Sequence, residues 1–241
     1  MNEPSVSVRN LTKSFSGRTV VDDLSFDVHK GQVFALLGHN GAGKSTTIDL
    51  ILGLKAPEKG SARLLGLDAA KNRKKVFERV GVQLQHTQYQ QGITVEEACM
   101  EYASLYAAPA DYSQLLEQFG LGALRKNFVS KLSGGERQKL SVVLALIGNP
   151  EIVFLDELTT GLDVVARREV WRTLKGLKNQ GLTIFLTTHY MEEAEALCDR
   201  VCILRSGKKV AEGTIEEIVA ASGQRNLEEA YLFFMGEEEL L

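Results

Sequence analysis

Nine residues early in the chain have the types and spacing of a phosphate-binding loop: Gly38, His39, Asn40, Gly41, Ala42, Gly43, Lys44, Ser45 and Thr46. They fit the pattern G-x-x-x-x-G-K-[ST]. Glycines let successive backbone N–H groups point at phosphate oxygens without Cβ clashes. Lys44 would reach the β- and γ-phosphates, and the Ser45 hydroxyl would bind Mg²⁺. The alternative is a plain glycine-rich turn.

The segments beside this loop favour the nucleotide interpretation. The apolar run over residues 33–37 predicts a buried strand, and residues 46–52 predict a helix that Gly53 ends. A strand, a glycine loop and a helix in this order form the context in which the motif binds phosphate. The helix N-terminus would add positive potential.

Two carboxylates end another apolar stretch much later in the chain. Residues 152–155 predict a buried strand, and Asp156 and Glu157 follow it directly. Asp156 would hold Mg²⁺ through water, and Glu157 would polarise an attacking water. The alternative is two solvated carboxylates at a strand end, which the presence of Lys44 disfavours.

A second glycine-containing helix start lies between these motifs, over residues 132–138. Ser133 can cap the helix, and Glu136 stands three residues later. A plain capped helix explains both residues but not Gly134 and Gly135, because glycine is a poor helix former. Glycines there would let backbone amides approach an anion. Either both helix ends bind one nucleotide, or the second end serves a nucleotide on another chain.

Composition limits the functional classes to which the protein can belong. The 241-residue chain carries a net charge of −3, which gives no basic field for nucleic acid. Cys99, Cys198 and Cys202 lack the spacing of a metal site and, with the nucleotide loop, fit a reducing cytosol. The polar start predicts no signal peptide, and no apolar run approaches the length of a membrane span. We therefore expect no direct membrane insertion, but docking on a membrane protein is possible.

The order of helix and strand signals predicts an α/β chain. The opening is strand-rich and resembles an antiparallel flank, with alternating burial expected over residues 24–28. No strand signal is convincing from about 86 to 148, where Thr94 with Glu97 and then Asp111 begin helices. This region is therefore a predicted helical insert. Further expected elements are a turn at 56–60, a helix over 164–179 capped by Asp163, strands at 183–187 and 201–204, a helix at 191–197, and a capping box at Thr214.

Three motifs in this order and spacing, at residues 38–46, 132–138 and 155–157, resemble those of an ABC-transporter ATPase subunit, and the resemblance covers nearly the whole chain. Many NTPases share the phosphate loop, whereas the Leu-Ser-Gly-Gly-Glu stretch is specific to the ABC class. The resemblance implies a P-loop NTPase fold with a mainly parallel core sheet, an N-terminal antiparallel β flank and an inserted α-helical subdomain. We expect one ABC ATPase domain over 1–241, with an α/β core at 1–85 and 149–225, a helical subdomain at 86–148 and a tail at 226–241.

The resemblance also implies residue roles. Phe15 resembles the aromatic that stacks on adenine, although a core phenylalanine is the alternative. Gln85 resembles the glutamine that senses Mg²⁺ and couples to the transmembrane partner. His189 resembles the switch histidine that contacts the γ-phosphate. Asp163 lies in a segment that resembles the one meeting a partner subunit. The predicted catalytic residues are Lys44, Gln85, Glu157 and His189; the nucleotide-binding residues are Phe15, Gly38, His39, Asn40, Gly41, Ala42, Gly43, Lys44, Ser45, Thr46, Ser133, Gly134 and Gly135; the metal-binding residues are Ser45, Gln85 and Asp156; and Asp163 is a dimer-interface residue.

Two positions depart from the family's usual sequence. Proline usually stands where His39 and Leu158 are found here. We expect the His39 side chain to face out of the loop, so that nucleotide binding survives. Leu158 would reduce the rigidity of the interface segment without changing the chemistry.

The resemblance implies ATP and Mg²⁺ as cofactors and a head-to-tail dimer of two copies. Each ATP would lie between the Lys44 loop of one copy and the Ser133–Gly135 helix end of the other. The chain would then power export through a separate transmembrane permease, at the inner face of the plasma membrane, like ATPases of bacterial drug, antibiotic and lipid exporters. Candidate permease contacts are Tyr89, Ile93, Tyr102 and Tyr106, with the core of the insert as the alternative. Other possibilities are a soluble ABC ATPase acting on nucleic acid or ribosomes, and an ATP-dependent scaffold acting on a soluble partner.

Overall fold

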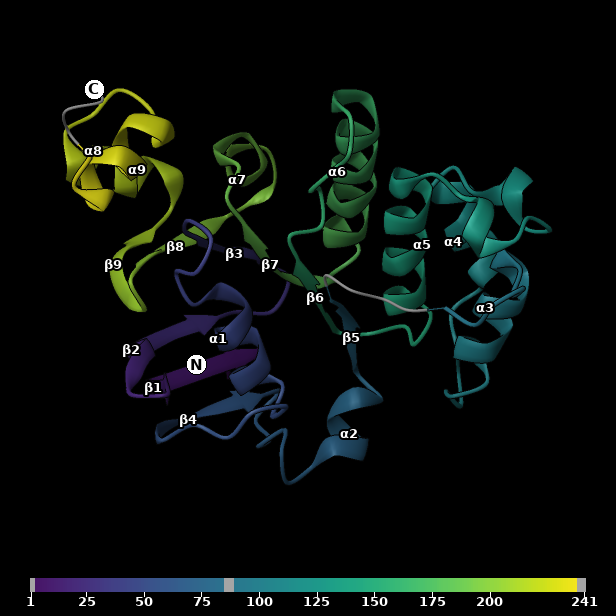
Figure 1. The fold of residues 1–241 in the computed structure, drawn as a ribbon, viewed down its shortest axis with the longest axis horizontal. Helices are drawn as coiled ribbons and strands as arrows, with labels where there is room; N and C mark the ends of the chain where they lie inside the picture. The colour runs from purple at the N-terminus through teal and green to yellow at the C-terminus, as the bar shows by residue number, and fades with distance from the viewer. Residues whose placement is uncertain (1–2, 85–88, 238–241) are drawn as a thin grey trace. The chain divides into compact units, whose positions relative to one another are not determined.

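The chain forms two compact units in a computed structural model that describes residues 3–84 and 89–237 (Figure 1). Unit 1 combines Met1–Val76 with Phe185–Leu241, and unit 2 is Phe77–Ile184. The boundary therefore falls inside strand β7 (Thr183–Thr188). The domain limits expected from the sequence, with a helical subdomain over 86–148, stay a prediction.

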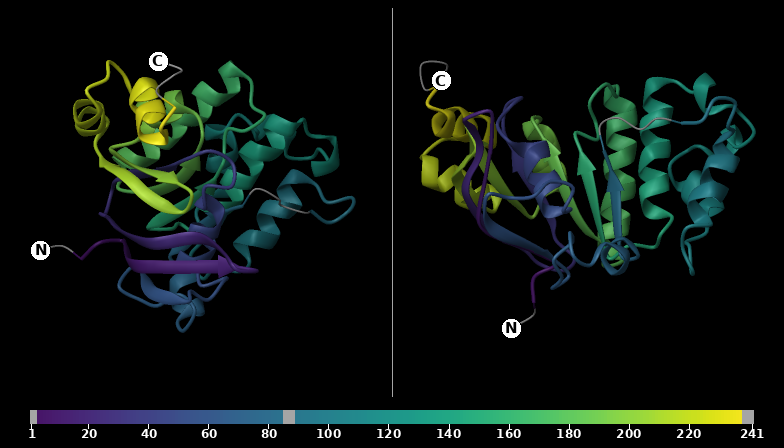
Figure 2. Two further views of the ribbon diagram at one scale, coloured as in Figure 1. Left: turned by 60° about the vertical axis from the view of Figure 1, so that its left-hand side comes forward. Right: turned by 60° about the horizontal axis from the view of Figure 1, so that its bottom comes forward.

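Unit 1 begins with a small antiparallel sheet, visible in two views (Figure 1, Figure 2). Its strands are β1 (Val6–Phe15), β2 (Arg18–Val28) and β4 (Lys59–Leu64), in the order β2-β1-β4. Ser16 and Gly17 both have positive φ in the two-residue turn that joins β1 to β2, the geometry that matches strand twist in a tight hairpin. This sheet confirms the predicted N-terminal flank.

Strand β4 was missed by the sequence analysis, which expected only a turn at 56–60. Five of its six residues are not buried, so the strand shows no apolar alternation. It is held instead by backbone pairing with β1, from Val6 opposite Leu64 to Thr12 opposite Lys59. Hydrophobic periodicity does not reveal such a strand, because the strand is stabilised by pairing with β1 and not by an apolar face.

Unit 1 also contains the strands that carry the phosphate loop. β7, β3 (Val33–Leu37), β8 (Arg200–Arg205) and β9 (Lys208–Gly213) follow one another in that order. β3 pairs in parallel with β8, whereas β9 is antiparallel. Every residue of β3 is buried, as the bare apolar run predicts for a strand covered on both faces. The rings of Phe26, Phe34 and Phe185 stack in the core, with centroids 5.1–6.0 Å apart.

The helices of unit 1 are mostly those expected. The ranges are α1 (Lys44–Ile51), α7 (Met191–Leu197), α8 (Ile215–Ser222) and α9 (Leu227–Met235), with the short α2 (Arg73–Phe77) at the unit boundary. α1 begins two residues earlier than predicted, directly after Gly43. Thr214 forms its predicted capping box on α8. The segment expected only as a tail from 226 forms the helix α9, whose N-cap is Asn226.

Unit 2 joins two parallel strands to the helical insert. The strands are β5 (Val80–Gln83) and β6 (Ile152–Asp156), and the helices are α3 (Val95–Ala103), α4 (Tyr112–Gln118), η1 (Gly122–Leu124), η2 (Val129–Lys131), α5 (Gly134–Leu146) and α6 (Val164–Asn179). α5 packs against both strands and against α3 and α4. Gly81 permits this packing, since a Cβ there would clash with the carbonyl oxygen of Ala145.

The described part of the insert, residues 89–148, contains helices and turns and no strand beyond one isolated bridge. Thr94 and Asp111 cap α3 and α4 as predicted. Nowhere in residues 3–84 and 89–237 is there a helix of the length and apolarity needed to span a membrane.

Candidate nucleotide site

The phosphate loop of unit 1 leaves the end of β3 and enters α1. His39, Asn40 and Gly41 are exposed, and the loop then becomes buried from Ala42 to Lys44. The His39 side chain faces out, as expected, with its Nδ1 2.7 Å from the Asn40 carbonyl oxygen. The departure from proline therefore puts no side chain into the loop.

Two glycines of the loop are required by its shape. Gly43 has φ +104°, and a Cβ on it would lie 2.5 Å from the carbonyl oxygen of Val20. A Cβ on Gly38 would lie 2.8 Å from the carbonyl oxygen of Leu204. Larger residues at these two positions would clash with β2 or β8, because both strands pack closely against the loop.

Lys44 folds back over the loop that precedes it. Its Nζ donates to the carbonyl oxygens of Gly38 at 2.7 Å and His39 at 3.2 Å, and the residue is 4% exposed. The ammonium thus lies beside the exposed loop residues, where a phosphate chain would be neutralised. Ser45 and Thr46, in the first turn of α1, are half-buried. The positive end of the helix adds to the charge of Lys44.

Phe15 ends β1 and is 40% exposed, which rules out the alternative of a core phenylalanine. Nζ of Lys13 lies 5.4 Å from the ring centroid, and Nζ of Lys55 lies 5.3 Å from it. The two ammonium groups are attracted to the π-system of this exposed ring, and such a ring can also stack on a planar base. The role of Phe15 toward adenine stays a prediction.

His189 directly follows β7 in unit 1, as the sequence predicts for a residue at a strand end. It is half-buried, and its ring lies 4.2 Å from the ring of Tyr190, centroid to centroid. Thr188 accepts a hydrogen bond from the backbone N–H of Tyr190, which stabilises the turn after the strand.

Unit 2 carries the two carboxylates. Asp156 is the last residue of β6 and is 4% exposed. Its backbone N–H donates to Oε1 of Gln83, on the neighbouring strand β5, at 3.1 Å. Gln83 is itself 2% exposed. Gln83 is not among the predicted site residues, although a glutamine inside an apolar strand is a visible signal of a buried polar contact.

Glu157 has a backbone conformation that is rare for its residue type. Its φ is +49°, in the left-handed region. This conformation costs roughly 1–2 kcal/mol for a residue with a Cβ. Such strain tends to persist at functional sites, where the surrounding structure imposes it. Here Asp156 precedes it in a buried strand, and the buried Leu158 and Thr159 follow.

The glycine-containing helix start opens onto a groove of about 510 Å³ in unit 2. Ser133 caps α5 and forms the predicted capping box with Glu136, with N···O distances of 3.2 Å and 2.7 Å. Hydrogen bonding from Ser133, first of all from its backbone N–H at 2.7 Å, lowers the pKa of the Glu136 carboxyl. Ser133 and Gly134 are exposed, and open space surrounds the position that a Cβ on Gly134 would take. The helix end is therefore accessible to an anion.

The segment after Glu157 forms the other wall of this groove. Gly161, Leu162 and Asp163 line it together with Ser133 and Gly135, so the structure brings two predicted interface elements together. Asp163 Oδ1 accepts from the backbone N–H of Ala166 at 2.9 Å and caps α6, as predicted. The proline expected at 158 is replaced by a buried leucine, 2% exposed.

Oxygen donors suited to Mg²⁺ are present at two predicted positions. The Ser45 hydroxyl and the Asp156 carboxylate are hard ligands of the kind this ion prefers. Gln85, the third predicted ligand, lies outside the described residues. Within the described ranges, no three or more His, Cys, Asp or Glu side chains group to hold a metal on their own. Cys198 ends α7 and Cys202 lies in β8, so these two thiols do not share a helix face.

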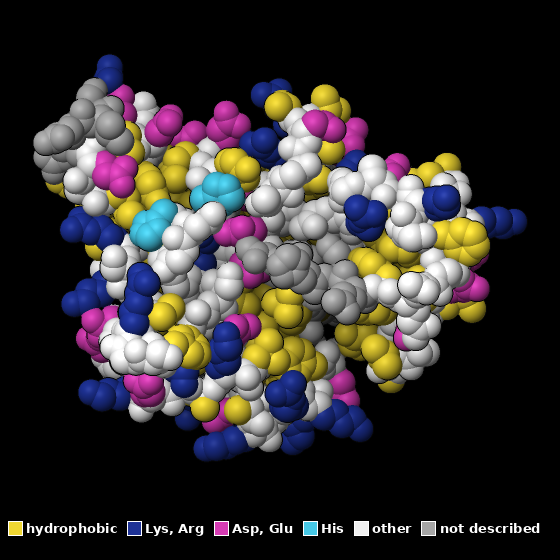
Figure 3. Space-filling model, in the orientation of Figure 1, with side chains coloured by type: hydrophobic (Ala, Val, Ile, Leu, Met, Phe, Trp, Pro, Cys, Tyr) yellow, Lys and Arg dark blue, Asp and Glu magenta, His cyan; other side chains and the backbone are white. Residues whose placement is uncertain are grey.

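The four candidate permease contacts are partly exposed. Tyr89, Ile93, Tyr102 and Tyr106 are all intermediate in exposure, and burial raises the pKa of the three tyrosines. More exposed apolar side chains of unit 2 were missed: Leu84, Met100, Leu105 and Phe128, at 37–71% exposure. Hydrophobic side chains are visible among charged ones over α3 and α4 (Figure 3).

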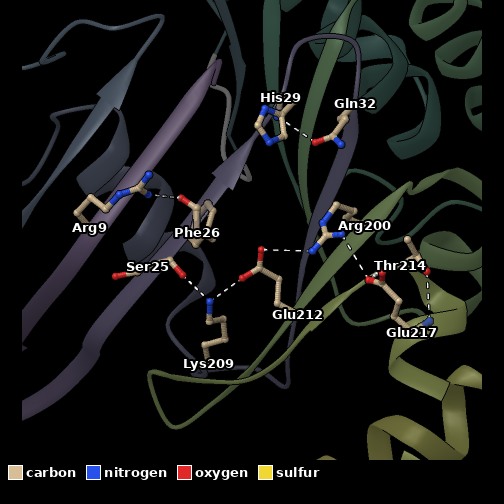
Figure 4. Close-up of polar contacts among 10 residues, drawn as sticks. All are labelled: Arg9, Ser25, Phe26, His29, Gln32, Arg200, Lys209, Glu212, Thr214 and Glu217. Atoms are coloured by element: carbon tan, nitrogen blue, oxygen red, sulfur yellow. Dashed lines mark hydrogen bonds and ion pairs between the residues drawn. The ribbon is translucent and has the colours of Figure 1, made fainter. Parts of the chain in front are cut away.

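A polar groove in unit 1, lined in part by Arg9 and Arg200, is not an anion site (Figure 4). Arg9 pairs with Asp27 at 2.7 Å. Arg200 lies 3.4 Å from Glu217 and 3.9 Å from Glu212, and Lys209 donates to Glu212 at 2.6 Å. Each of these cations is already matched by a carboxylate. The Arg9–Asp27 pair joins β1 to β2, and the other pairs join β8, β9 and α8.

Comparison with known proteins decides the family. The family model described as ABC transporter matches residues 21–160. The chain belongs to the ABC transporter family. It is similar to Nod factor export ATP-binding protein I of Paraburkholderia xenovorans, 39% identical over 226 residues, which are 92% of this chain and 74% of that protein. It is 41% identical over 221 residues to the protein of the same name from Ralstonia nicotianae, covering 90% and 69% of the two chains.

Solved structures agree with this assignment. An ATP-binding subunit of an ABC transporter superposes with a TM-score of 0.87 at 30% identity, covering 95% of this chain and 98% of that one. A nucleotide-free ATP-binding cassette, at 22% identity and a TM-score of 0.82 over 95% and 99% of the two chains, shares the fold. The predicted fold class and the predicted membership of the ABC ATPases are thereby confirmed.

Proposed function

We propose that this ABC ATPase binds and hydrolyses ATP as one of two identical copies and so drives export through a separate membrane permease. The observation that supports this most is the accessible start of α5. Ser133 and Gly134 offer an anion-binding helix end on an open groove whose other wall carries Asp163. The chain already has one phosphate loop. A second anion-binding helix end is therefore explained if that helix end binds the nucleotide of a partner copy.

The phosphate loop would bind the ATP phosphates through its backbone N–H groups, and Lys44 would neutralise their charge. Phe15 would stack on the adenine ring. Ser45, Asp156 and Gln85 would hold Mg²⁺, which when bound supplies positive charge at the β- and γ-phosphate oxygens. The lysine then has a second role, because it already orders the loop through the carbonyl oxygens of Gly38 and His39.

Hydrolysis needs a group that orients and polarises water in line with the γ-phosphate. We assign this role to Glu157, because it directly follows Asp156 at the end of β6 and has a left-handed backbone conformation of the kind found at functional sites. His189 would contact the γ-phosphate, and its half-buried ring is held beside Tyr190. Asp163 would contact the partner copy while it caps α6.

ATP binding would close the dimer, because each triphosphate bridges a phosphate loop and a Ser133–Gly135 helix end of the other copy. Loss of the γ-phosphate would remove the bridge. Since the relatives are named for export of Nod factors, the direction proposed here is export. The site of action would be the inner face of the plasma membrane, with the exposed apolar residues of unit 2 available to the permease.

Replacing Glu157 tests the proposal. Glu157→Gln should remove ATP turnover but keep binding, so the variant with ATP and Mg²⁺ should elute from gel filtration as a dimer. Glu195→Gln, at an exposed position on α7, is the matched control and should behave as wild type. Normal turnover by Glu157→Gln would remove the role assigned to Glu157.

The partner is tested separately by isolating the chain from detergent-solubilised membranes. Co-purification with a membrane permease is expected. Recovery only in the soluble fraction, bound to a soluble protein or to nucleic acid, would instead favour a scaffold or a soluble ABC ATPase.

A further inference from the structure

The turn between β8 and β9 lies against the phosphate loop of unit 1. Ser206 and Gly207 form this two-residue turn, with φ of +49° and +82°. The backbone N–H of Gly207 donates to the carbonyl oxygen of Ala42, inside the loop, at 3.0 Å. The buried part of the loop therefore has a fixed partner on a strand pair that comes much later in the chain.

Gly207 is held on its other side by β2. Its carbonyl oxygen accepts the backbone N–H of Asp22 at 2.9 Å. A Cβ on Gly207 would lie 2.5 Å from the carbonyl oxygen of Val20, the same oxygen that leaves no room for a Cβ on Gly43. The turn, β2 and the loop are thus packed backbone to backbone, and only a residue without a Cβ fits at position 207.

The Ala42 carbonyl belongs to the peptide group that also carries the Gly43 N–H. This peptide is trans, so its N–H points in the opposite direction to its carbonyl and therefore away from the turn. Gly43 is the N-cap residue of α1, and N–H groups at such a helix end are those that bind phosphate oxygens. The turn thus holds one end of a peptide whose other end belongs to the phosphate-binding helix start.

We propose that Gly207 is a positioning residue for the nucleotide: its N–H holds the Ala42 carbonyl and so aims the Gly43 N–H at a phosphate oxygen. The inference rests on the proposed function, since the loop must bind a nucleotide for the effect to be seen. Gly207 also holds Asp22 on β2, the strand that pairs with the end of β1 where Phe15 lies. One residue thereby links the sheet that carries Phe15 to the phosphate loop.

Replacement of Gly207 by alanine tests the proposal, with the Kd of MgADP measured by calorimetry on the full chain. The added Cβ would push the turn away from the loop, so the Kd should rise about three- to tenfold, as expected for one net hydrogen bond. The turnover number at saturating ATP should stay within about twofold of wild type, because Gly207 touches no reacting group. Gly223→Ala is the matched control: its φ is +71°, so the backbone strain is similar, but open space surrounds its Cβ, and the Kd should not change.

The Gly43 N–H gives a readout that a general loss of stability would not produce. Ala42–Gly43 is the only Ala-Gly pair in the sequence, so ¹³C-carbonyl alanine combined with ¹⁵N-glycine selects this one amide in a nuclear magnetic resonance spectrum. Addition of MgADP should move its proton resonance downfield in the wild-type chain and in Gly223→Ala, because a hydrogen bond to an anion is short and strong. The movement should be clearly smaller in Gly207→Ala, also at saturating MgADP.

A measurement on the wild-type chain keeps the proposal testable if Gly207→Ala does not fold. Coupling between two sites is reciprocal, so MgADP should slow hydrogen exchange of the Gly207 N–H about three- to tenfold. The Gly223 N–H, which donates to the carbonyl oxygen of Val219 in α8, is the control and should change little.

Three results would each overturn the proposal: a Kd of Gly207→Ala equal to that of Gly223→Ala, a wild-type movement of the Gly43 resonance in Gly207→Ala, or exchange of the Gly207 N–H that MgADP leaves unchanged. Failure of the wild-type chain to bind MgADP would instead refute the proposed function, so the two failures are distinguishable.

Discussion

Gln83 and Asp156 are linked across two parallel strands: the Oε1 atom of Gln83 accepts the backbone N–H of Asp156 at 3.1 Å, and both residues are almost fully buried. The last peptide of β6 thereby gains a fixed partner at the point where the strand delivers its carboxylates. The Gln83 side chain thus fixes the backbone of the residue proposed to hold Mg²⁺.

Removal of this hydrogen bond should destabilise unit 2. Gln83→Leu leaves the Asp156 N–H buried without an acceptor, which costs about 1–3 kcal/mol. Urea denaturation followed by circular dichroism measures the loss of unfolding free energy. Gln114→Leu, on an exposed position of α4, is the control, and equal stability of the two variants would contradict this role of Gln83.

Relief of the Glu157 backbone strain should separate stability from activity. Glycine adopts a φ of +49° without Cβ clashes, so Glu157→Gly should be more stable than Glu157→Ala by about 1 kcal/mol. Both variants should lose ATP hydrolysis. Thermal unfolding and a phosphate-release assay measure the two effects, and an alanine variant as stable as the glycine variant would show that the site imposes no strain.

The cap of α5 should have an effect beyond stability. Ser133→Ala and Thr214→Ala each remove a hydroxyl that accepts a backbone N–H at 3.2 Å in a capping box. Each should cost about 1 kcal/mol of stability. Only Ser133→Ala should also suppress ATP-dependent dimer formation on gel filtration. Equal loss of dimer formation in both variants would indicate a purely structural role for Ser133.

The exposed ring of Phe15 should matter for nucleotide affinity but little for folding. Phe15→Ala should raise the KM for ATP roughly tenfold, in line with a stacking contact of about 1–3 kcal/mol. Phe15→Trp should largely restore it. Phe128→Ala removes a ring of similar exposure, 47% against 40%, in unit 2 and serves as the control. An unchanged KM for Phe15→Ala would show that Phe15 does not stack on adenine.

The Arg9–Asp27 pair should make stability depend on pH at the acid side. The Arg9 guanidinium holds the pKa of Asp27 below its ordinary value through a 2.7 Å hydrogen-bonded contact. A lowered folded-state pKa means that the stabilisation is present above the unfolded-state pKa, about 3.9, and is lost as the pH falls through the folded-state value. Asp27→Asn should therefore be less stable than wild type at pH 7, and the difference should shrink below about pH 4. A constant difference in urea midpoint from pH 7 to pH 3 would contradict this.

Much of the local structure follows from short-range chemistry that is visible in the sequence. The capping boxes at Thr94, Ser133 and Thr214 form as predicted, because each depends on residues only three positions apart. Helix α6 has its predicted ends, since Asp163 starts it and Gly181, at φ +100°, follows its end. The buried strands β3 and β6 were also predicted, because each is a short continuous apolar run.

The elements missed by the sequence analysis depend on distant partners. β4 is an exposed strand that exists because β1 pairs with it, and α9 is held at its end by Arg205. Both elements draw stability from contacts over long sequence separations, which a local sequence pattern does not show.

By itself, the sequence determined the family, the phosphate loop, the carboxylates and the capped helix start, because each is a short motif whose chemistry lies in consecutive residues. Only the tertiary structure decided that Phe15 is exposed, that Gln83 supports Asp156, and that Glu157 takes a left-handed conformation. These properties arise where strands and helices far apart in the chain pack together, and packing of that kind is not encoded in any one stretch of residues.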